Sequence, residues 1–124
     1  RPAYDRSKAE GERAVREAIA SGLDAVVVHP TAIVGPWDFG PSRAGRLLLD
    51  LARRRLPALV AGGFDWVDAR DVADGLLAAA WRGRRGESYI LSGRWCSVAE
   101  LAGLAAAATG IPRSATMDVT MNVP

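Results

Sequence analysis

The sequence has 124 residues, 49% of them apolar and 24% charged, so it can form one globular domain but not two independent ones. The net charge is +2 and the basic residues are dispersed apart from Arg53, Arg54 and Arg55, which indicates no nucleic-acid partner. A single cysteine, Cys96, excludes an intrachain disulfide, offers no metal-ligand spacing and favours the cytoplasm. No apolar run is long enough to span a membrane and the charged start is not a signal peptide, so we expect no membrane partner.

Helix and strand patterns alternate along the chain, which predicts an α/β fold. Strong helix formers predict a helix over residues 4–21, ended by Gly22. The run "DAVVVHP" is apolar on both faces at residues 25–28, which predicts a buried strand of a parallel sheet that ends at Pro30. Glycines and prolines punctuate residues 31–42 and predict a loop there.

The second half continues the alternation. Leucine spacing predicts a helix over residues 42–55, and "PALVAGG" predicts a short strand at 57–63. Asp68 or Ala69 begins the next predicted helix, which contains "RDVADGLLAAAWRG", and "SYILSG" predicts a third strand at 88–93.

The last helix has the clearest local signal. Ser97 and Glu100 form a capping box ahead of "LAGLAAAA", and Gly110 and Pro112 close the helix. The remainder has no helical period, so we expect an irregular tail at 114–124 after an ordered part at 1–113.

Three short strands cannot form a complete sheet, because a strand that is apolar on both faces needs covering layers and neighbouring strands. We expect these strands to pair with a part of the protein outside this sequence. The absence of an initial methionine agrees with a piece of a longer protein.

Lys8 is the only lysine among fifteen arginines, and it follows Tyr4 by four residues. In a helix this spacing places the phenol and the ammonium on one face. An ammonium held near a phenol favours the phenolate, which suits the phenol to proton transfer, and arginine is not equivalent because it is bulkier and planar.

This stretch, "YDRSKAEGERAV", resembles the Tyr-x-x-x-Lys active-site helix of the short-chain dehydrogenase/reductase superfamily, and of its extended branch, the NAD-dependent epimerase/dehydratase family. Three later stretches resemble the same family in the same order: "VVVHPTAIVGPWD", "FDWVDARDVADGLLAA" and "GESYILSGRWCSVAELAGLAAAATG". The resemblance implies an α/β fold: the C-terminal part of a Rossmann-like parallel-sheet NAD(P)-binding fold with its small substrate-binding region.

The resemblance also implies roles for individual residues. Tyr4 would be the general acid/base, and Lys8 would favour its phenolate and hold the nicotinamide ribose. Pro30 and the backbone of Thr31, Ala32 and Ile33 would line the nicotinamide of NAD or NADP, between which the sequence does not distinguish. The residues that could wall the substrate cleft are Trp37, Phe39 and Arg43.

Two family features are missing. No segment fits the glycine-rich turn that binds the cofactor pyrophosphate, and the Ser or Thr that completes the catalytic set would precede Tyr4 by more than the three residues available. The resemblance therefore implies an N-terminal half of the same fold as a partner, and weak or absent NAD(P)H binding by this chain alone.

One position informs the substrate class. Nucleotide-sugar enzymes of this family carry an arginine seven residues before the aspartate aligned with Asp71, and Phe64 stands there in this chain. "GPWDFGPSRAGRLL" resembles the dihydroflavonol reductase-like branch, which implies reduction of a ketone or aldehyde on a less charged substrate. Arg43 or Arg46 could still bind an anion, so a nucleotide-sugar epimerase or dehydratase is the alternative.

A second alternative is a non-catalytic module that binds a partner through a sheet edge or through the Tyr4 helix. In extended reductases that helix packs in a dimer interface, and Gly11, Ala14 and Ala18 would permit close approach. The resemblance thus also implies a homodimer.

Overall fold

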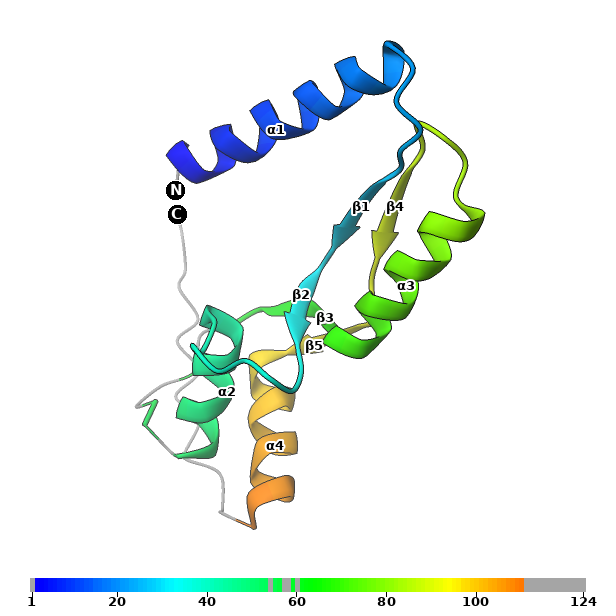
Figure 1. Cartoon of the computed structure of the whole chain (residues 1–124). Coiled ribbons are helices and arrows are strands. Elements are labelled where there is room, and N and C mark those ends of the chain that lie inside the picture. The colour runs from blue at the N-terminus through cyan, green and yellow to red at the C-terminus, as the bar shows by residue number, and fades with distance from the viewer. Residues whose placement is uncertain (1, 54, 57–58, 60, 111–124) are drawn as a thin grey trace. The chain divides into compact units, whose positions relative to one another are not determined.

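The computed structural model describes residues 2–53, 55–56, 59 and 61–110 (Figure 1). The predicted irregular tail at 114–124 lies outside the described residues, and so do Pro112 and residues 57, 58 and 60 of the predicted strand at 57–63. None of the helices within the described ranges is long and apolar enough to cross a lipid bilayer.

The chain mixes helices and strands as the sequence predicted, although at two places one strand follows another directly. All four expected helices are present. In chain order the elements are α1 (Pro2–Ala20), β1 (Val27–Pro30), β2 (Ala32–Val34), α2 (Arg43–Ala52), β3 (Gly63–Asp68), α3 (Ala69–Arg82), β4 (Ser88–Leu91), β5 (Arg94–Ser97) and α4 (Val98–Thr109). The strands form one sheet with the order β1-β4 and a second with the order β2-β3-β5.

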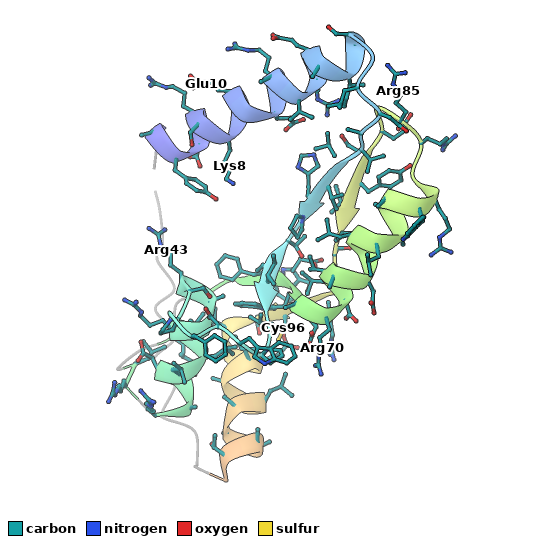
Figure 2. The ribbon with its side chains drawn as sticks, in the orientation of Figure 1. Lys8, Glu10, Arg43, Arg70, Arg85 and Cys96 are labelled. Carbon is teal, nitrogen blue, oxygen red and sulfur yellow. The ribbon has the colours of Figure 1, made fainter. Side chains whose placement is uncertain are left out.

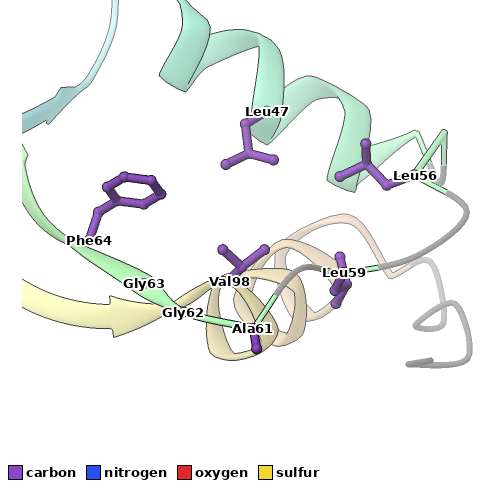
Figure 3. Close-up of a pocket in the computed structure, with 8 residues that line it drawn as sticks. All are labelled: Leu47, Leu56, Leu59, Ala61, Gly62, Gly63, Phe64 and Val98. Carbon is purple, nitrogen blue, oxygen red and sulfur yellow. The ribbon is translucent and has the colours of Figure 1, made fainter. Parts of the chain in front are cut away.

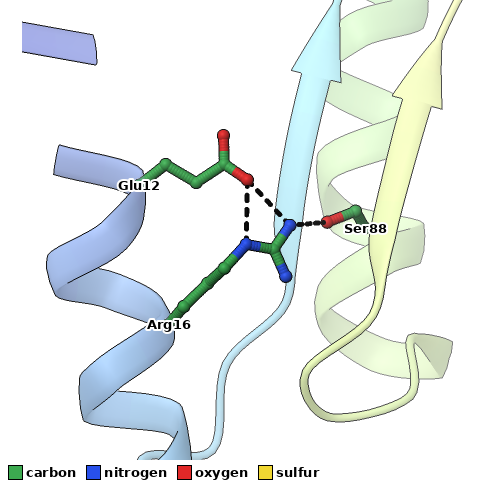
Figure 4. Close-up of polar contacts among 3 residues, drawn as sticks. All are labelled: Glu12, Arg16 and Ser88. Carbon is green, nitrogen blue, oxygen red and sulfur yellow. Dashed lines mark hydrogen bonds and ion pairs between the residues drawn. The ribbon is translucent and has the colours of Figure 1, made fainter. Parts of the chain in front are cut away.

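The chain divides into two compact units, and the first contains the segment up to His29 together with Ala73–Ile90. Within it, β1 runs beside β4, and the Val27 N–H donates to the Glu87 carbonyl at 3.0 Å. Arg16 ties α1 to β4, because its guanidinium donates to Ser88 Oγ at 2.9 Å and is held by Glu12 Oε1 at 2.7 Å (Figure 4).

The second unit contains Pro30–Val72 and the segment that begins at Leu91. Strand β3 pairs in parallel with β2, with Ile33 opposite Val67, and antiparallel with β5, with Phe64 opposite Cys96. Helices α2 and α4 pack against each other. Among the described residues of this unit the buried apolar side chains are Val67, Val72, Cys96 and Val98.

Side-chain caps fix where the helices begin. The Asp68 carboxylate accepts a hydrogen bond from the Arg70 N–H at 2.8 Å at the start of α3, and the Arg70 guanidinium bonded to it lowers the pKa of Asp68 to about 2. At α4, Ser97 Oγ accepts from the Glu100 N–H while the Glu100 carboxylate accepts from Ser97, which lowers the pKa of Glu100. The predicted capping box and the Gly110 stop, at φ 68°, are both confirmed.

The strands differ most from the sequence prediction. The loop expected at 31–42 begins with β2, and β3 begins at Gly63, where the predicted strand was to end. Strand β5 was not expected at all. These strands have three to six residues, and β3 and β5 mix aromatic with charged side chains. They form because partners distant in sequence pair with them.

The structure leaves large apolar side chains exposed in both units. Trp81 is 84% exposed on α3 and Ile90 is 73% exposed on β4. On α3, Val72 and Ala79 are buried, whereas Leu76 is 48% exposed. A chain that buried its whole core would not leave such residues in water.

Replacing Ser97 with alanine removes the hydroxyl that caps α4. We expect the unfolding free energy of the full-length protein to fall by about 1 kcal/mol, measured by urea unfolding with circular dichroism. Ser97→Thr keeps the hydroxyl and should remain close to wild type. An equal loss in both variants would show that the hydroxyl does not provide the stabilisation.

Candidate functional site

Tyr4 and Lys8 lie one turn apart on α1, as the sequence predicted. The Lys8 ammonium is 5.6 Å from the centre of the Tyr4 ring, and Tyr4 is 63% exposed. Figure 2 shows Lys8 and Glu10 projecting from different sides of α1, so the Glu10 carboxylate does not lie on the Lys8 face. The pair therefore presents one phenol and one ammonium together to solvent.

Lys8 also borders a groove of about 530 Å³ within the first unit. Ser7, Gly11 and Glu12 line its wall on α1, and Val26–Val28 line the opposite wall. Glu12 is already paired with Arg16, and in the described part of the chain Lys8 forms no ion pair. The ammonium thus keeps its three N–H donors for a ligand.

The segment expected to line a nicotinamide belongs to the second unit. Pro30 ends β1 and is exposed, and Ala32 and Ile33 begin β2, where Ile33 is 40% exposed. The Thr31 N–H donates to the Leu91 carbonyl at 3.0 Å. The Thr31 N–H is therefore already used in the sheet. The partly exposed side chain of Ile33 remains available to a ligand.

Sequence reasoning missed Asp65, which holds this segment in place. Its Oδ1 accepts from Thr31 Oγ1 at 3.1 Å and from the Gly93 N–H at 2.9 Å. A half-buried carboxylate in β3 thereby joins the start of β2 to the turn before β5. The available signal was a charged residue between two aromatic ones, Phe64 and Trp66, in a segment that was not recognised as a strand.

The three proposed substrate residues lie in and after one loop of the second unit. Trp37 is 72% exposed and Phe39 87% exposed, and Arg43 is exposed at the start of α2. Trp37 has φ 66°, a backbone conformation that is strained for a bulky residue. Strain of this kind persists only where the surrounding structure enforces it and is found often at ligand sites.

Asp38 enforces that loop conformation. Its carboxylate accepts hydrogen bonds from the Ser42 N–H and Ser42 Oγ at 2.9 Å, and Ser42 Oγ in turn accepts from the Gly45 N–H at 3.0 Å. A Cβ at Gly45 would collide with the Asp38 carboxylate. The loop is therefore anchored to the first turn of α2.

An apolar pocket of about 430 Å³ opens beside β3 in the second unit (Figure 3). Phe64, 54% exposed, forms one wall, with its ring 5.4 Å from that of Trp66 in an edge-to-face arrangement. The lining residues are Leu47, Leu56, Leu59, Ala61, Gly62, Gly63, Phe64 and Val98. No local sequence signal identifies this pocket, because it combines three separate stretches of the chain.

The predicted site residues therefore fall into two groups. The structure brings Tyr4 and Lys8 together on α1 in the first unit. The others all belong to the second unit: Pro30, Thr31, Ala32, Ile33, Trp37, Phe39 and Arg43.

Comparison with known proteins gives a family. The model of the NAD dependent epimerase/dehydratase family matches residues 1–92. Sterol demethylase protein B of Methylococcus capsulatus is 44% identical over 110 residues, which are 89% of this chain and 34% of that protein. A Synechocystis protein with the provisional name dihydroflavonol 4-reductase is 38% identical over 114 residues, 89% of this chain and 33% of that protein.

Among solved structures, that of the protein gox2253 is similar to this chain with a TM-score of 0.85 and 35% identity. The similarity covers 91% of this chain and 34% of gox2253. This chain thus spans about a third of the length of the curated relatives it matches. The likeness confirms the predicted fold class, since it covers all but a tenth of the chain.

The backbone strain at Trp37 leads to a stability prediction. Asparagine tolerates positive φ better than tryptophan, so Trp37→Asn should keep or raise the thermal unfolding midpoint although it removes a large side chain. Phe39→Asn is the matched control, because Phe39 is similarly exposed and has no positive φ. If Trp37→Asn instead lowered the unfolding free energy by more than about 1 kcal/mol, packing of the indole would outweigh the strain.

Proposed function

Since this chain belongs to the NAD dependent epimerase/dehydratase family, we propose that it carries the proton-transfer pair of an NAD(P)-dependent oxidoreductase that reduces a ketone or aldehyde. The paired display of Tyr4 and Lys8 on α1 is the observation that carries this proposal. The proposed activity is that of the whole protein, and this chain would supply the Tyr4 and Lys8 pair to it.

The residues present fit a nicotinamide nucleotide. Lys8 has donors that are not committed to a carboxylate in the described residues, which suits the paired hydroxyls of a ribose. Pro30, Thr31, Ala32 and Ile33 supply an apolar edge and backbone carbonyls, which suit a flat ring that bears a carboxamide. When bound, the cofactor would supply hydride to the carbonyl carbon.

Tyr4 would then donate its phenolic proton to the carbonyl oxygen, so that the carbonyl becomes an alcohol. The Lys8 ammonium lies 5.6 Å from the centre of the Tyr4 ring. Its positive charge would attract the negative charge left on the oxygen once the proton has gone. Exposure of Tyr4 in the described chain leaves its Oη accessible to a substrate oxygen. In the reverse direction, the same oxygen would accept the proton of the alcohol.

Three observations support a substrate of low charge. Phe64 stands where the family's nucleotide-sugar enzymes would place an arginine, and a phenyl ring cannot pair with a phosphate. Trp37 and Phe39 present further aromatic surface. The two curated relatives carry names that refer to a sterol and to a dihydroflavonol, both of which are ring systems without phosphate.

We also propose that a preceding part of the same fold completes the site. The sequence contains no match to the glycine-rich motif G-x-G-x-x-G, which binds a dinucleotide pyrophosphate. The exposed apolar side chains of the first unit, Trp81 and Ile90 among them, would be covered by that part. A homodimer through α1 would use the surface around Gly11, where a Cβ would meet nothing within 4 Å.

The proton-transfer pair is tested in the full-length protein by Tyr4→Phe and Lys8→Arg. Tyr4→Phe should lower kcat by roughly 10²- to 10⁴-fold, because the proton donor is removed. Lys8→Arg should lower kcat and raise KM for the cofactor, because a planar guanidinium replaces a compact ammonium. Tyr89→Phe and Arg13→Lys are matched controls away from the pair, and wild-type rates in Tyr4→Phe would overturn the assignment.

The substrate class is tested by assaying the full-length protein against aromatic ketones and against nucleotide sugars. We expect NAD(P)H-dependent turnover of the ketones only. Phe64→Arg should lower kcat/KM for the ketones, because it places a charge beside an apolar ligand. Turnover of nucleotide sugars alone would favour the epimerase or dehydratase alternative, and turnover of neither would favour a non-catalytic module.

A further inference from the structure

The described walls of the pocket beside β3 are apolar. Figure 3 shows Leu47 of α2 and Val98 of α4 pointing toward each other across it, with Phe64 and Leu56 at its sides. No described lining residue carries a charged or polar side chain. Its volume, about 430 Å³, lies within the roughly 300–1,000 Å³ of small-molecule sites.

One backbone carbonyl at the pocket floor already has a partner within the chain. The Gly62 carbonyl accepts a hydrogen bond from the Val98 N–H at 3.0 Å. Gly62 and Gly63 add no side chain, and a Cβ at Gly62 would meet nothing within 4 Å, so the floor stays open. A polar ligand would lose its water there without gaining equivalent hydrogen bonds.

The start of α4 could in principle attract an anion, because a helix N-terminus presents free N–H groups and a positive dipole end. Here Glu100 already occupies that position. Its carboxylate accepts from the Ser97 N–H at 2.8 Å and from Ser97 Oγ at 2.7 Å. A second negative charge, such as a diphosphate, would be repelled by this carboxylate.

We infer that this pocket binds an apolar part of the substrate, an aliphatic chain or hydrocarbon ring, and that it selects substrates by the apolar surface they bury. The inference rests on the proposed function insofar as the occupant is a substrate. Leu47, Phe64 and Val98 contact the apolar group, and no residue of the pocket takes part in proton transfer. The pocket would therefore determine which substrates bind and would take no part in the reaction itself.

The test uses the full-length protein and unbranched methyl ketones from butanone to decanone. In wild type, kcat/KM should rise by roughly fourfold for each methylene that enters the pocket. Leu47→Gln, which preserves side-chain size and helix propensity, should flatten this dependence. Leu104→Gln is the matched control, because Leu104 lies on α4, is 59% exposed and does not line the pocket.

Phe64→Arg is the second variant if Leu47→Gln does not fold, since Phe64 is half exposed and tolerates a longer polar side chain. Turnover that does not depend on chain length in wild type, or the same dependence in wild type and both pocket variants, would overturn the inference and leave the proposed function standing.

A binding measurement separates the two proposals if no ketone is reduced. Calorimetry with 2-decanone should show binding to wild type and to Leu104→Gln, and at least tenfold weaker binding to Leu47→Gln. That result without turnover would support the pocket and overturn the proposed function. No measurable difference among the three proteins would overturn the pocket.

Discussion

Strand β3 is the element on which both the segment at residues 30–33 and the apolar pocket depend. It is paired on both edges, and Val67 within it is the most buried of the described core residues, at 3% exposed. Because side chains alternate along a strand, the register that buries Val67 also fixes where Asp65 and Phe64 lie. A slip of one residue would break the contact of Asp65 with Thr31 and remove Phe64 from the pocket wall together.

The helices could be predicted because their determinants are local. Ser97 and Glu100 are three residues apart, Gly22 and Gly110 adopt the positive φ that ends a helix, and each signal can be recognised within one turn. The strands could not be predicted to the same degree. The segment of β3 has no clean alternation, and β5 exists because it pairs with β3, where Phe64 lies opposite Cys96, a residue distant in sequence.

The same division separates the predicted site residues from the missed ones. The Tyr4 and Lys8 pair is a local helical spacing, so the sequence alone indicates their proximity, and the structure confirms it. Asp65 and the pocket are products of tertiary packing. Leu47, Phe64 and Val98 come from three elements, and nothing in the sequence around any one of them indicates the other two.

The Tyr4 and Lys8 pair and the apolar pocket differ in the polar groups around them, as their proposed roles require. Proton transfer needs a polar atom that stays accessible, and Tyr4 and Lys8 lie on an exposed helix face where water and a substrate oxygen can reach them. Recognition of an apolar group needs the opposite, a surface whose own polar groups are already satisfied. The hydrogen bond from the Val98 N–H to the Gly62 carbonyl and the closed Ser97–Glu100 cap contribute to this, because each pairs polar groups near the pocket within the chain itself. The cap that begins α4 stabilises the helix, and in the inference drawn above its Glu100 carboxylate also disfavours an anion in the neighbouring pocket.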